Sequence, residues 1–432
     1  MVILERSCRR SSTGELEPRH CRSRVLSATL GDYAWLAVLN LLLFESALQE
    51  IIPSFSYIDE ISTILLTLAA INVGAKGTRL GTLRLFVLGL VVIGVGLFGN
   101  LLFGVQQSIQ AILIDLFTCV KYPIAAVASF VVLRNRDSLM DLVLLECKAL
   151  LVVMSACAVF NLFMDIGMGS EVRYGIRSYS FVFPHYTFLS FGLAGMLLLL
   201  CQDLPKNRLW IALALILMCA TLRSKSFGFV AIFLILVFSR RSKISPYLLV
   251  TMGGIVAVVL AWDQIVYYYT SDGFARNELT RAAFEVAHDY APIGTGFATF
   301  GSNITSEPRF YSSLYYEYGL SNVYGLTPND ASFVSDTFWP TVLGQFGYVG
   351  LAAYVAMLVT LFLFQKKCLS GIAVAALCAY LLISSTSESA FFNPSAVFLA
   401  FCSGLAAAGF QNTTSKRSCE PHPKNDDWGF EK

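Results

Sequence analysis

Hydrophobic stretches of membrane-spanning length recur along almost the whole chain, and they restrict its fold more than any other feature. A helix needs about 20 mostly apolar residues to cross a bilayer, and helices and closed barrels satisfy their backbone hydrogen bonds there. The chain of 432 residues is 56% hydrophobic and 14% charged, whereas a soluble domain has about 25% charged residues. The sequence therefore predicts an all-α polytopic membrane protein.

Twelve stretches have the length and apolar composition of a span. They lie near residues 33–52, 57–75, 83–104, 107–133, 141–164, 181–201, 208–222, 225–239, 246–266, 337–365, 370–386 and 391–410. The seventh and eighth are short, and we expect them to form a tight pair joined by a charged turn. The prediction is about 12 transmembrane helices.

Lysine and arginine fall on alternate connections, as the positive-inside rule predicts. If the N-terminus is cytoplasmic, the inward connections hold basic residues such as Arg134 and Arg136. The outward connections near 53–56 and 387–390 contain no Lys or Arg. Both termini are therefore expected in the cytoplasm.

Charge and hydropathy divide the chain into five parts. Residues 1–29 carry six arginines and no apolar core of signal-peptide length, so we expect a basic, mostly unstructured cytoplasmic tail. Residues 30–266 contain transmembrane helices one to nine, and 337–410 contain helices ten to twelve. Residues 267–336, here named the polar segment, form one large, partly helical loop that the alternation places outside. Residues 411–432 are polar and are expected to be a disordered cytoplasmic tail.

Two outward connections contain cations, against the positive-inside pattern. One holds Arg223 and Lys225, and the other, 165–180, holds Arg173 and Arg177. Such cations either extend to lipid headgroups or serve a functional site. The sequence leaves both interpretations open.

Ionisable residues also fall inside the expected spans. They are Glu45, Asp115, Lys121, Glu146 and Lys148. Charges in hydrocarbon are costly and usually pair or line a cavity. We interpret Lys121 as paired with Asp115 or Glu45, in preference to a transport pathway, because the sequence shows no repeated acidic relay.

The polar segment contains a predicted amphipathic helix near 277–290. Arg281, Glu285 and His288 fall at i, i+4 and i+7 and share one helix face. The helix is expected to end at the turn Pro292-Ile293-Gly294-Thr295-Gly296. This turn is not a nucleotide-binding loop, because it follows a helix and lacks a third glycine.

The polar segment is rich in aromatic residues, with fifteen Phe and Tyr in its seventy positions. Some are expected to form a small core, and carbohydrate is the partner that best suits the rest, because sugar C–H faces pack on aromatic rings. The segment has three Arg against eight Asp and Glu. It is therefore not a general polyanion binder, and nucleic acid is not expected as a partner.

Several motifs resemble those of the O-antigen ligase and polymerase superfamily. They are Arg281-Ala-Ala-Phe-Glu-Val-Ala-His-Asp-Tyr-Ala-Pro-Ile-Gly-Thr-Gly-Phe, Asp336-Thr-Phe-Trp-Pro-Thr-Val-Leu-Gly-Gln-Phe-Gly-Tyr-Val-Gly, Leu222-Arg223-Ser224-Lys225-Ser226, and Ser387-Glu388 ahead of Pro394. The resemblance covers roughly residues 170–405, by motif order and topology.

The resemblance implies glycosyl transfer at the outer face of the bacterial cytoplasmic (inner) membrane. The expected partners are a polyprenyl-diphosphate-linked oligosaccharide, a growing glycan chain, the lipid bilayer and a chain-length regulator. Arginine can stabilise a leaving diphosphate without a metal, so no cofactor is expected. No Asp-x-Asp motif and no Cys-x-x-Cys spacing occurs that would indicate a metal site.

The resemblance also implies roles for individual residues. Arg281, Asp336 and His288 are expected to be catalytic, and Arg223, Lys225 and Arg177 to bind the diphosphate. Asp336 is either a general base or the N-cap of the tenth span, and His288 is either functional or a surface partner of Glu285.

The resemblance leaves several functions to be distinguished. Ligases of the superfamily carry His where this chain has Asp336, which favours a polymerase of lipid-linked repeat units for O-antigen, capsule or exopolysaccharide. The alternatives are a ligase that transfers finished glycan to lipid or protein, a polysaccharide flippase, and an envelope scaffold. A flippase does not need a large aromatic cap.

Overall fold

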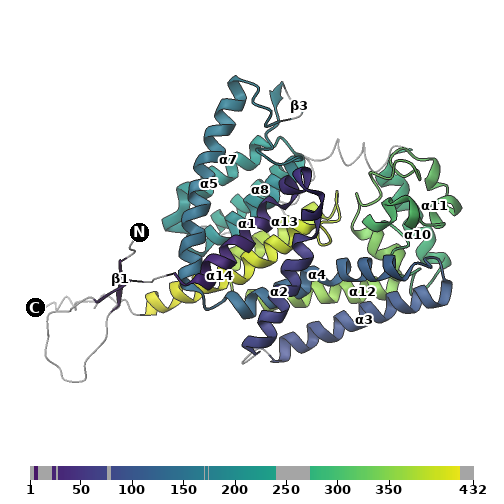
Figure 1. The fold of residues 1–432 in the computed structure, drawn as a ribbon, viewed down its shortest axis with the longest axis horizontal. Coiled ribbons are helices and arrows are strands. Elements are labelled where there is room, and N and C mark those ends of the chain that lie inside the picture. Colours follow the sequence, from purple (N-terminus) through teal and green to yellow (C-terminus); the bar gives the residue numbers. More distant parts are fainter. Residues whose placement is uncertain are drawn as a thin grey trace, which may run out of the picture.

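The computed structural model describes residues 4–7, 22–25, 28–74, 79–169, 171–173, 175–239 and 273–418. Within this part of the chain, seven helices are long and apolar enough to cross a membrane. The protein is therefore a multi-pass, all-α membrane protein, as the sequence predicts (Figure 1). The expected ninth span, 246–266, lies outside the described residues.

Apolar helices occupy the positions of the other expected spans. They are α1 (Leu30–Ile51), α2 (Ile58–Val73, after the short helix η1, Pro53–Tyr57), α3 (Arg79–Phe103), α4 (Ile109–Leu133), α5 (Asp137–Phe163), α6 (Tyr186–Leu200), α7 (Leu204–Ala220, after η2, Cys201–Asp203), α8 (Ser224–Ser239), α12 (Trp339–Lys366), α13 (Gly371–Ser384) and α14 (Pro394–Ser418). The apolar parts of α8, α13 and α14 are shorter than a full span, so the number twelve remains a prediction.

Close packing of α14 against α4 holds the centre of the bundle together. A Cβ atom at Gly404 would lie 2.4 Å from the carbonyl carbon of Ser129, so only glycine permits this approach. The hydroxyl of Ser129 in turn donates a 2.7 Å hydrogen bond to the carbonyl oxygen of Ala400. Small residues that bring backbones together stabilise helix pairs inside membranes.

The described part of the polar segment packs over one end of α4 and α12 (Figure 1). Its elements are α10 (Ala275–Asp289), η3 (Asn303–Ser306), η4 (Pro308–Phe310), α11 (Leu314–Glu317) and η5 (Leu320–Asn322). The predicted amphipathic helix is therefore present as α10, with Leu279, Ala283 and Val286 buried. A small core beneath it includes Phe300 and Tyr315.

The glycine-containing turn after α10 inserts into a break in α12. Gly347 has φ +60° inside α12, and a Cβ atom at Gly294 would lie 2.4 Å from its backbone nitrogen. The N–H of Gly296 donates to the carbonyl of Gln345 at 2.8 Å, and the N–H of Val349 donates to the carbonyl of Pro292 at 3.1 Å. These bonds satisfy polar groups that the helix break would otherwise leave unpaired.

The carboxylate of Asp115 in α4 connects this turn to the membrane bundle. It accepts hydrogen bonds from the N–H of Ala298 at 2.6 Å, from Nε2 of Gln345 at 2.9 Å and from the hydroxyl of Ser302. The expected pairing of Lys121 with Asp115 or Glu45 is therefore wrong. Lys121 instead pairs with Asp59, because α4 packs against the first turn of α2.

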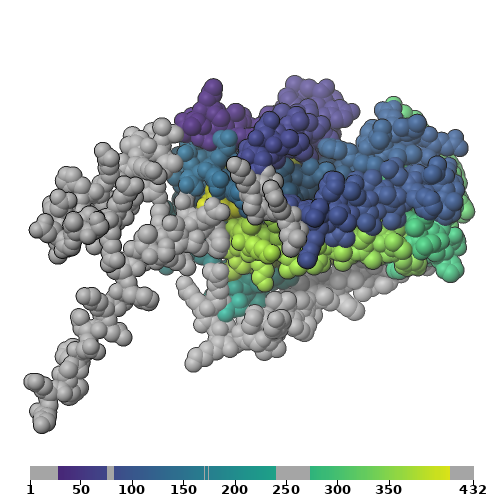
Figure 2. Space-filling model, turned by 90° about the horizontal axis from the view of Figure 1, so that it is seen from below, coloured from purple at the N-terminus to yellow at the C-terminus, as the bar shows by residue number. Residues whose placement is uncertain are grey.

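One further helix contact and one hairpin complete the description of the bundle. Helix α3 runs beside α12, as the blue and yellow-green surfaces in Figure 2 show. Between α5 and α6 lies a short antiparallel hairpin of β3 (Val172–Arg173) and β4 (Ile176–Arg177). This hairpin lies within the predicted 165–180 connection, which contains two of the unexpected cations.

Both expected tails contain more regular structure than their composition predicts. In the N-terminal tail, β1 (Leu4–Ser7) pairs with β2 (Arg22–Val25) in an antiparallel ladder. At the other end, α14 continues to Ser418, beyond the expected boundary at residue 410. Polar composition predicted disorder here, but a helix that is already formed extends at little further cost.

Candidate functional site

The turn that leads into α8 has a strained backbone and positions two cations. Leu222 has φ +52°, a left-handed conformation that is unusual for a bulky residue. The hydroxyl of Thr221 donates to Ser226 Oγ at 2.9 Å, and Ser226 Oγ lies 3.1 Å from Ser190 Oγ of α6. Backbone strain of this kind concentrates at functional sites, and here it precedes Arg223 directly.

Two ion pairs converge at this end of α8. Lys225 Nζ lies 2.5 Å from Glu388 Oε1, on the connection between α13 and α14. Arg276 Nη2 of α10 lies 3.0 Å from Asp336 Oδ2 and donates to the carbonyl of Ser387 at 3.2 Å. These contacts join four elements that are distant in the sequence, and we name Lys225, Arg276, Asp336 and Glu388 the charge cluster.

Asp336 has the properties of a perturbed acid within the charge cluster. Desolvation raises its pKa, the Arg276 guanidinium opposes the rise, Glu388 adds to it and Lys225 opposes it, and the net direction is upward. Its side chain is 30% exposed, so a ligand can still reach it. The N-cap of α12 is Phe338, with no side-chain capping bond, so the alternative interpretation of Asp336 as an N-cap is wrong.

Arg223 lies next to the charge cluster and packs on an aromatic ring. Its Cζ atom lies 3.5 Å from the ring centroid of Tyr186, a cation–π contact. Nη2 lies 3.4 Å from Nε2 of His185 and 4.0 Å from Glu171 Oε1. Tyr186 also donates to Glu171 Oε1 at 3.5 Å, so the four side chains form one polar group, here named the Arg223 group.

His185 connects the Arg223 group electrostatically to the charge cluster. Burial of its ring, which lies 3.8 Å from that of Tyr186, lowers the pKa first, and the cations Arg223 and Lys225 lower it further, to about 4. The imidazole is therefore neutral at pH 7. An uncharged His185 neither attracts nor repels an anion by net charge, so Arg223 and Lys225 supply the positive charge here.

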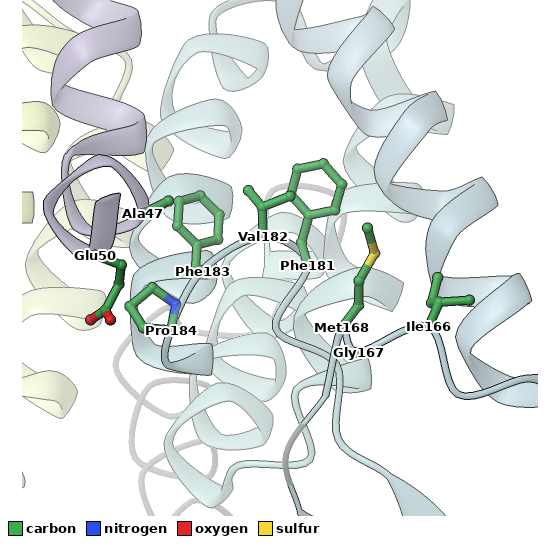
Figure 3. A pocket seen from close by; sticks show the side chains of 9 residues that line it. All are labelled: Ala47, Glu50, Ile166, Gly167, Met168, Phe181, Val182, Phe183 and Pro184. Atoms are coloured by element: carbon green, nitrogen blue, oxygen red, sulfur yellow. The ribbon is translucent and has the colours of Figure 1, made fainter. Parts of the chain in front are cut away.

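A pocket with both polar and apolar lining lies on the stretch of chain that leads to His185. It has a volume of about 420 Å³ and is lined by Ala47, Glu50, Ile166, Gly167, Met168, Phe181, Val182, Phe183 and Pro184 (Figure 3). Pro184 directly precedes His185, so the pocket and the polar group share one stretch of chain. Phe181 has φ +56°, a second strained residue in this region.

The structure brings only some of the predicted site residues together. Asp336 and Lys225 belong to the charge cluster, and Arg223 lies beside it. Arg281 instead lies on the exposed face of α10, where it pairs with Glu278 at 2.9 Å and Glu285 at 3.2 Å.

The remaining predicted residues also lie on exposed surfaces. His288 is exposed in the last turn of α10. Arg177 is at the hairpin and lies 3.4 Å from Asp165, with 38% of its side chain exposed. In the described part of the chain, the ion pairs of the charge cluster include neither residue, so their predicted roles remain predictions.

Arg276 is the site residue that the sequence did not reveal. The motif begins at Arg281, five residues later, and five residues at about 100° each put the two side chains roughly 140° apart around the helix. The two arginines therefore cannot point into the same site. The sequence did contain a signal for Arg276: it is a cation in the first turn of an amphipathic helix, on the side opposite the exposed polar face.

The aromatic residues of the polar segment divide between a core and a surface. Phe297, Phe300 and Tyr315 are completely buried, whereas Tyr316 and Tyr324 are 59% and 75% exposed. The expected small core is thus present, and other rings of the segment are exposed. No protein-family model matches the chain, and no curated protein matches it significantly.

Proposed function

We propose that the protein is a polysaccharide polymerase that transfers lipid-diphosphate-linked glycan units to a glycan acceptor. In this proposal it spans the bacterial cytoplasmic membrane twelve times, and the polar segment faces outward. One observation carries the proposal: Asp336 and Lys225, singled out by separate motifs, meet in one cluster at the connections of membrane helices.

The reaction needs charge stabilisation more than covalent chemistry. The bond between sugar C1 and the diphosphate oxygen breaks, a bond from C1 to the acceptor oxygen forms, and the lipid diphosphate leaves with the negative charge. Arg223 and Lys225 are suited to bind that diphosphate, because fixed cations stabilise charge where it develops. Each is now paired with a carboxylate, so the diphosphate must replace Glu171 and Glu388 as their partner.

Asp336 is the proposed general base. It would accept the proton of the acceptor hydroxyl as the new bond forms, and its raised pKa brings it closer to the range in which a carboxylate takes up protons efficiently. Arg276 holds the carboxylate by a 3.0 Å contact and keeps its orientation. In this proposal Arg276 is the arginine next to the base, whereas the motif had suggested Arg281 as the catalytic arginine.

The aromatic and aliphatic side chains in the pocket lining suit the lipid part of the donor. A polyprenyl diphosphate carries its charge at one end and a hydrocarbon chain at the other, and the pocket adjoins the Arg223 group in the same way. The exposed rings of Tyr316 and Tyr324 are suited to the glycan acceptor.

Deletion of the gene tests the proposal at the level of the product. A polymerase predicts surface polysaccharide with a single repeat unit and no ladder on a gel. Long chains that remain on the lipid carrier would indicate a ligase, and intermediates retained at the cytoplasmic face would indicate a flippase. Either of these outcomes would overturn the polymerase proposal.

The two arginines of α10 provide a matched test of the site. We expect Arg276→Gln to reduce transfer by about 10²-fold to 10³-fold, the range for loss of one stabilising donor. Arg281→Gln should leave transfer within about twofold, because its ion pairs lie on an exposed helix face. The reverse result would identify Arg281 as the catalytic arginine and would overturn the proposed role of Arg276.

A further inference from the structure

Three carboxyl groups surround one lysine inside the bundle, away from the charge cluster. Glu45 lies on α1, Asp59 and Glu60 lie in the first turn of α2, and Lys121 lies midway along α4. Asp59 and Glu45 are 0% and 4% exposed, and Lys121 is 2% exposed. We name these four residues the buried acid group.

The single lysine does not satisfy all three acids. Lys121 Nζ pairs with Asp59 Oδ2 and lies 3.5 Å from Glu60 Oε1. Both carboxyl oxygens of Glu45, as well as Oδ1 of Asp59, are buried with no hydrogen-bond donor among the described residues. The group therefore has one positive charge for three acids, in a region where an unpaired carboxylate is costly.

The arrangement of the acids requires a hydrogen between them. Glu45 and Asp59 act on each other electrostatically, as do Asp59 and Glu60, and each of the three acids has a buried oxygen without a donor among the described residues. Two carboxylates are acceptors only, so a contact between them is favourable only when one of them carries a proton. A metal cation is disfavoured in the same place, because the ammonium of Lys121 already occupies it.

We propose that the buried acid group binds one exchangeable proton, shared between Glu45 and Asp59 and delivered through Glu60. Glu60 is the most accessible of the three acids, with 28% of its side chain exposed, so it provides the route to solvent. The proton changes the net charge of the group from −2 to −1. This site is separate from the proposed transfer reaction and stands whether or not that proposal holds.

Charged groups elsewhere on the packed helices face other partners. The charges that act on Glu45 are Asp59, Lys121 and Glu60. On α5, Glu146 faces Asn40 and Lys148 lies 6.0 Å from the ring of Trp210.

The remaining charges of α1 and α4 lie away from the buried acid group or bind other partners, and Glu50, in the last turn of α1, is exposed at the pocket. Asp32, at the far end of α1, pairs with Arg136 at 3.0 Å, and Asp115 of α4 binds the turn of the polar segment. The proton is therefore controlled by the buried acid group itself.

Bound protons on carboxyl groups can be observed directly by infrared spectroscopy. The full-length protein in lipid nanodiscs at pH 7 is expected to show the C=O absorption of a protonated carboxylic acid. This absorption should shift in D₂O and on labelling with ¹³C-glutamate, and it should disappear in Glu45→Gln. The matched variant Glu146→Gln, another acid inside a span, should retain it.

The outcomes separate the proposal from a merely structural role. An absorption that is equally strong in the wild type and in Glu45→Gln would overturn it, since the proton would then lie elsewhere. If Glu45→Gln does not fold, the wild type alone decides. A glutamic acid absorption that is absent, or that fails to shift in D₂O, would exclude an exchangeable proton, whereas reversible loss at high pH would support one.

Discussion

Lys225 and Lys121 are both held by carboxylates, yet their surroundings give them opposite properties. Lys225 and Glu388 are 16% and 15% exposed, whereas Lys121 and Asp59 are 3% and 0% exposed. Arginines lie near the first lysine, and further acids surround the second. The first arrangement can exchange a carboxylate for an anionic ligand, while the second can only adjust its charge by binding a proton.

The difference shows how position in the membrane decides what an ion pair can do. A pair that keeps some contact with solvent can exchange one partner for an anion, so the lysine need not be left unpaired. A buried pair is different, because removing one partner leaves an unpaired charge in a poorly solvated place. The two lysines can therefore be compared by mutation.

Removal of the buried lysine is expected to have the largest effect. Lys121→Met leaves Asp59 without its cation and should destabilise the protein by about 3–5 kcal/mol. The measurement is thermal unfolding in detergent, followed by gel filtration. Lys148→Met is the control, since Lys148 lies in a span and faces the ring of Trp210 at 6.0 Å. Equal stability of the two variants would show that Lys121 is not a necessary partner of the acids.

Replacement of the proposed base should affect activity without affecting stability. Asp336→Asn keeps an oxygen that can accept from Arg276 but cannot take up a proton at neutral pH. We expect transfer to fall by about 10²-fold to 10⁴-fold, with unfolding temperature near that of the wild type. Glu285→Gln, on the exposed face of α10, is the control. Full activity of Asp336→Asn would remove it from the mechanism.

Local patterns predicted most of the helices but not the contacts between them. The positions of α1 to α8 and of α10 follow from length, hydropathy and periodicity, which are properties of neighbouring residues. The helix break at Gly347 was not predicted, because it depends on the turn at Gly294 docking there. Helix α14 exceeded its expected end, since composition predicts spans better than helix boundaries.

The candidate site was predictable only in part. Arg223 and Lys225 were singled out as cations on an outward connection, and Asp336 by the resemblance of the motif that it begins. The pairing of Arg276 with Asp336 spans sixty residues, and no periodic pattern extends across a connection between elements. Pairings of this kind are set by the packing of the bundle, so the sequence could suggest cations for the site without identifying their partners.

The pH dependence of transfer should distinguish Arg276 from Arg281. Transfer requires the Asp336 carboxylate, so activity should fall as the pH drops through its raised pKa. Arg276 opposes that rise, so Arg276→Gln should move the acid limb of the profile to still higher pH, and Arg281→Gln should leave it in place. A profile unchanged by Arg276→Gln would contradict the proposed electrostatic contact.

The same group has a predictable effect on stability. The folded pKa of Asp336 lies above its unfolded value, so protonation favours the folded protein. This contribution is complete below the unfolded pKa and is lost as the pH rises through the folded pKa. In Asp336→Asn this part of the stability profile should be absent, which unfolding measured across the acid range would show.

The smallest expected effect concerns the competition for Lys225. Glu388→Gln removes the carboxylate that now holds this lysine, so inorganic diphosphate should bind more tightly, by up to about fivefold, equivalent to about 1 kcal/mol. Titration calorimetry with inorganic diphosphate measures the change. Glu285→Gln removes one of the two carboxylates that hold Arg281 on an exposed surface and should have no effect. Weaker binding by Glu388→Gln would mean that Glu388 orients Lys225 for the anion, and this partly exposed pair would then resemble the buried one in depending on its partner.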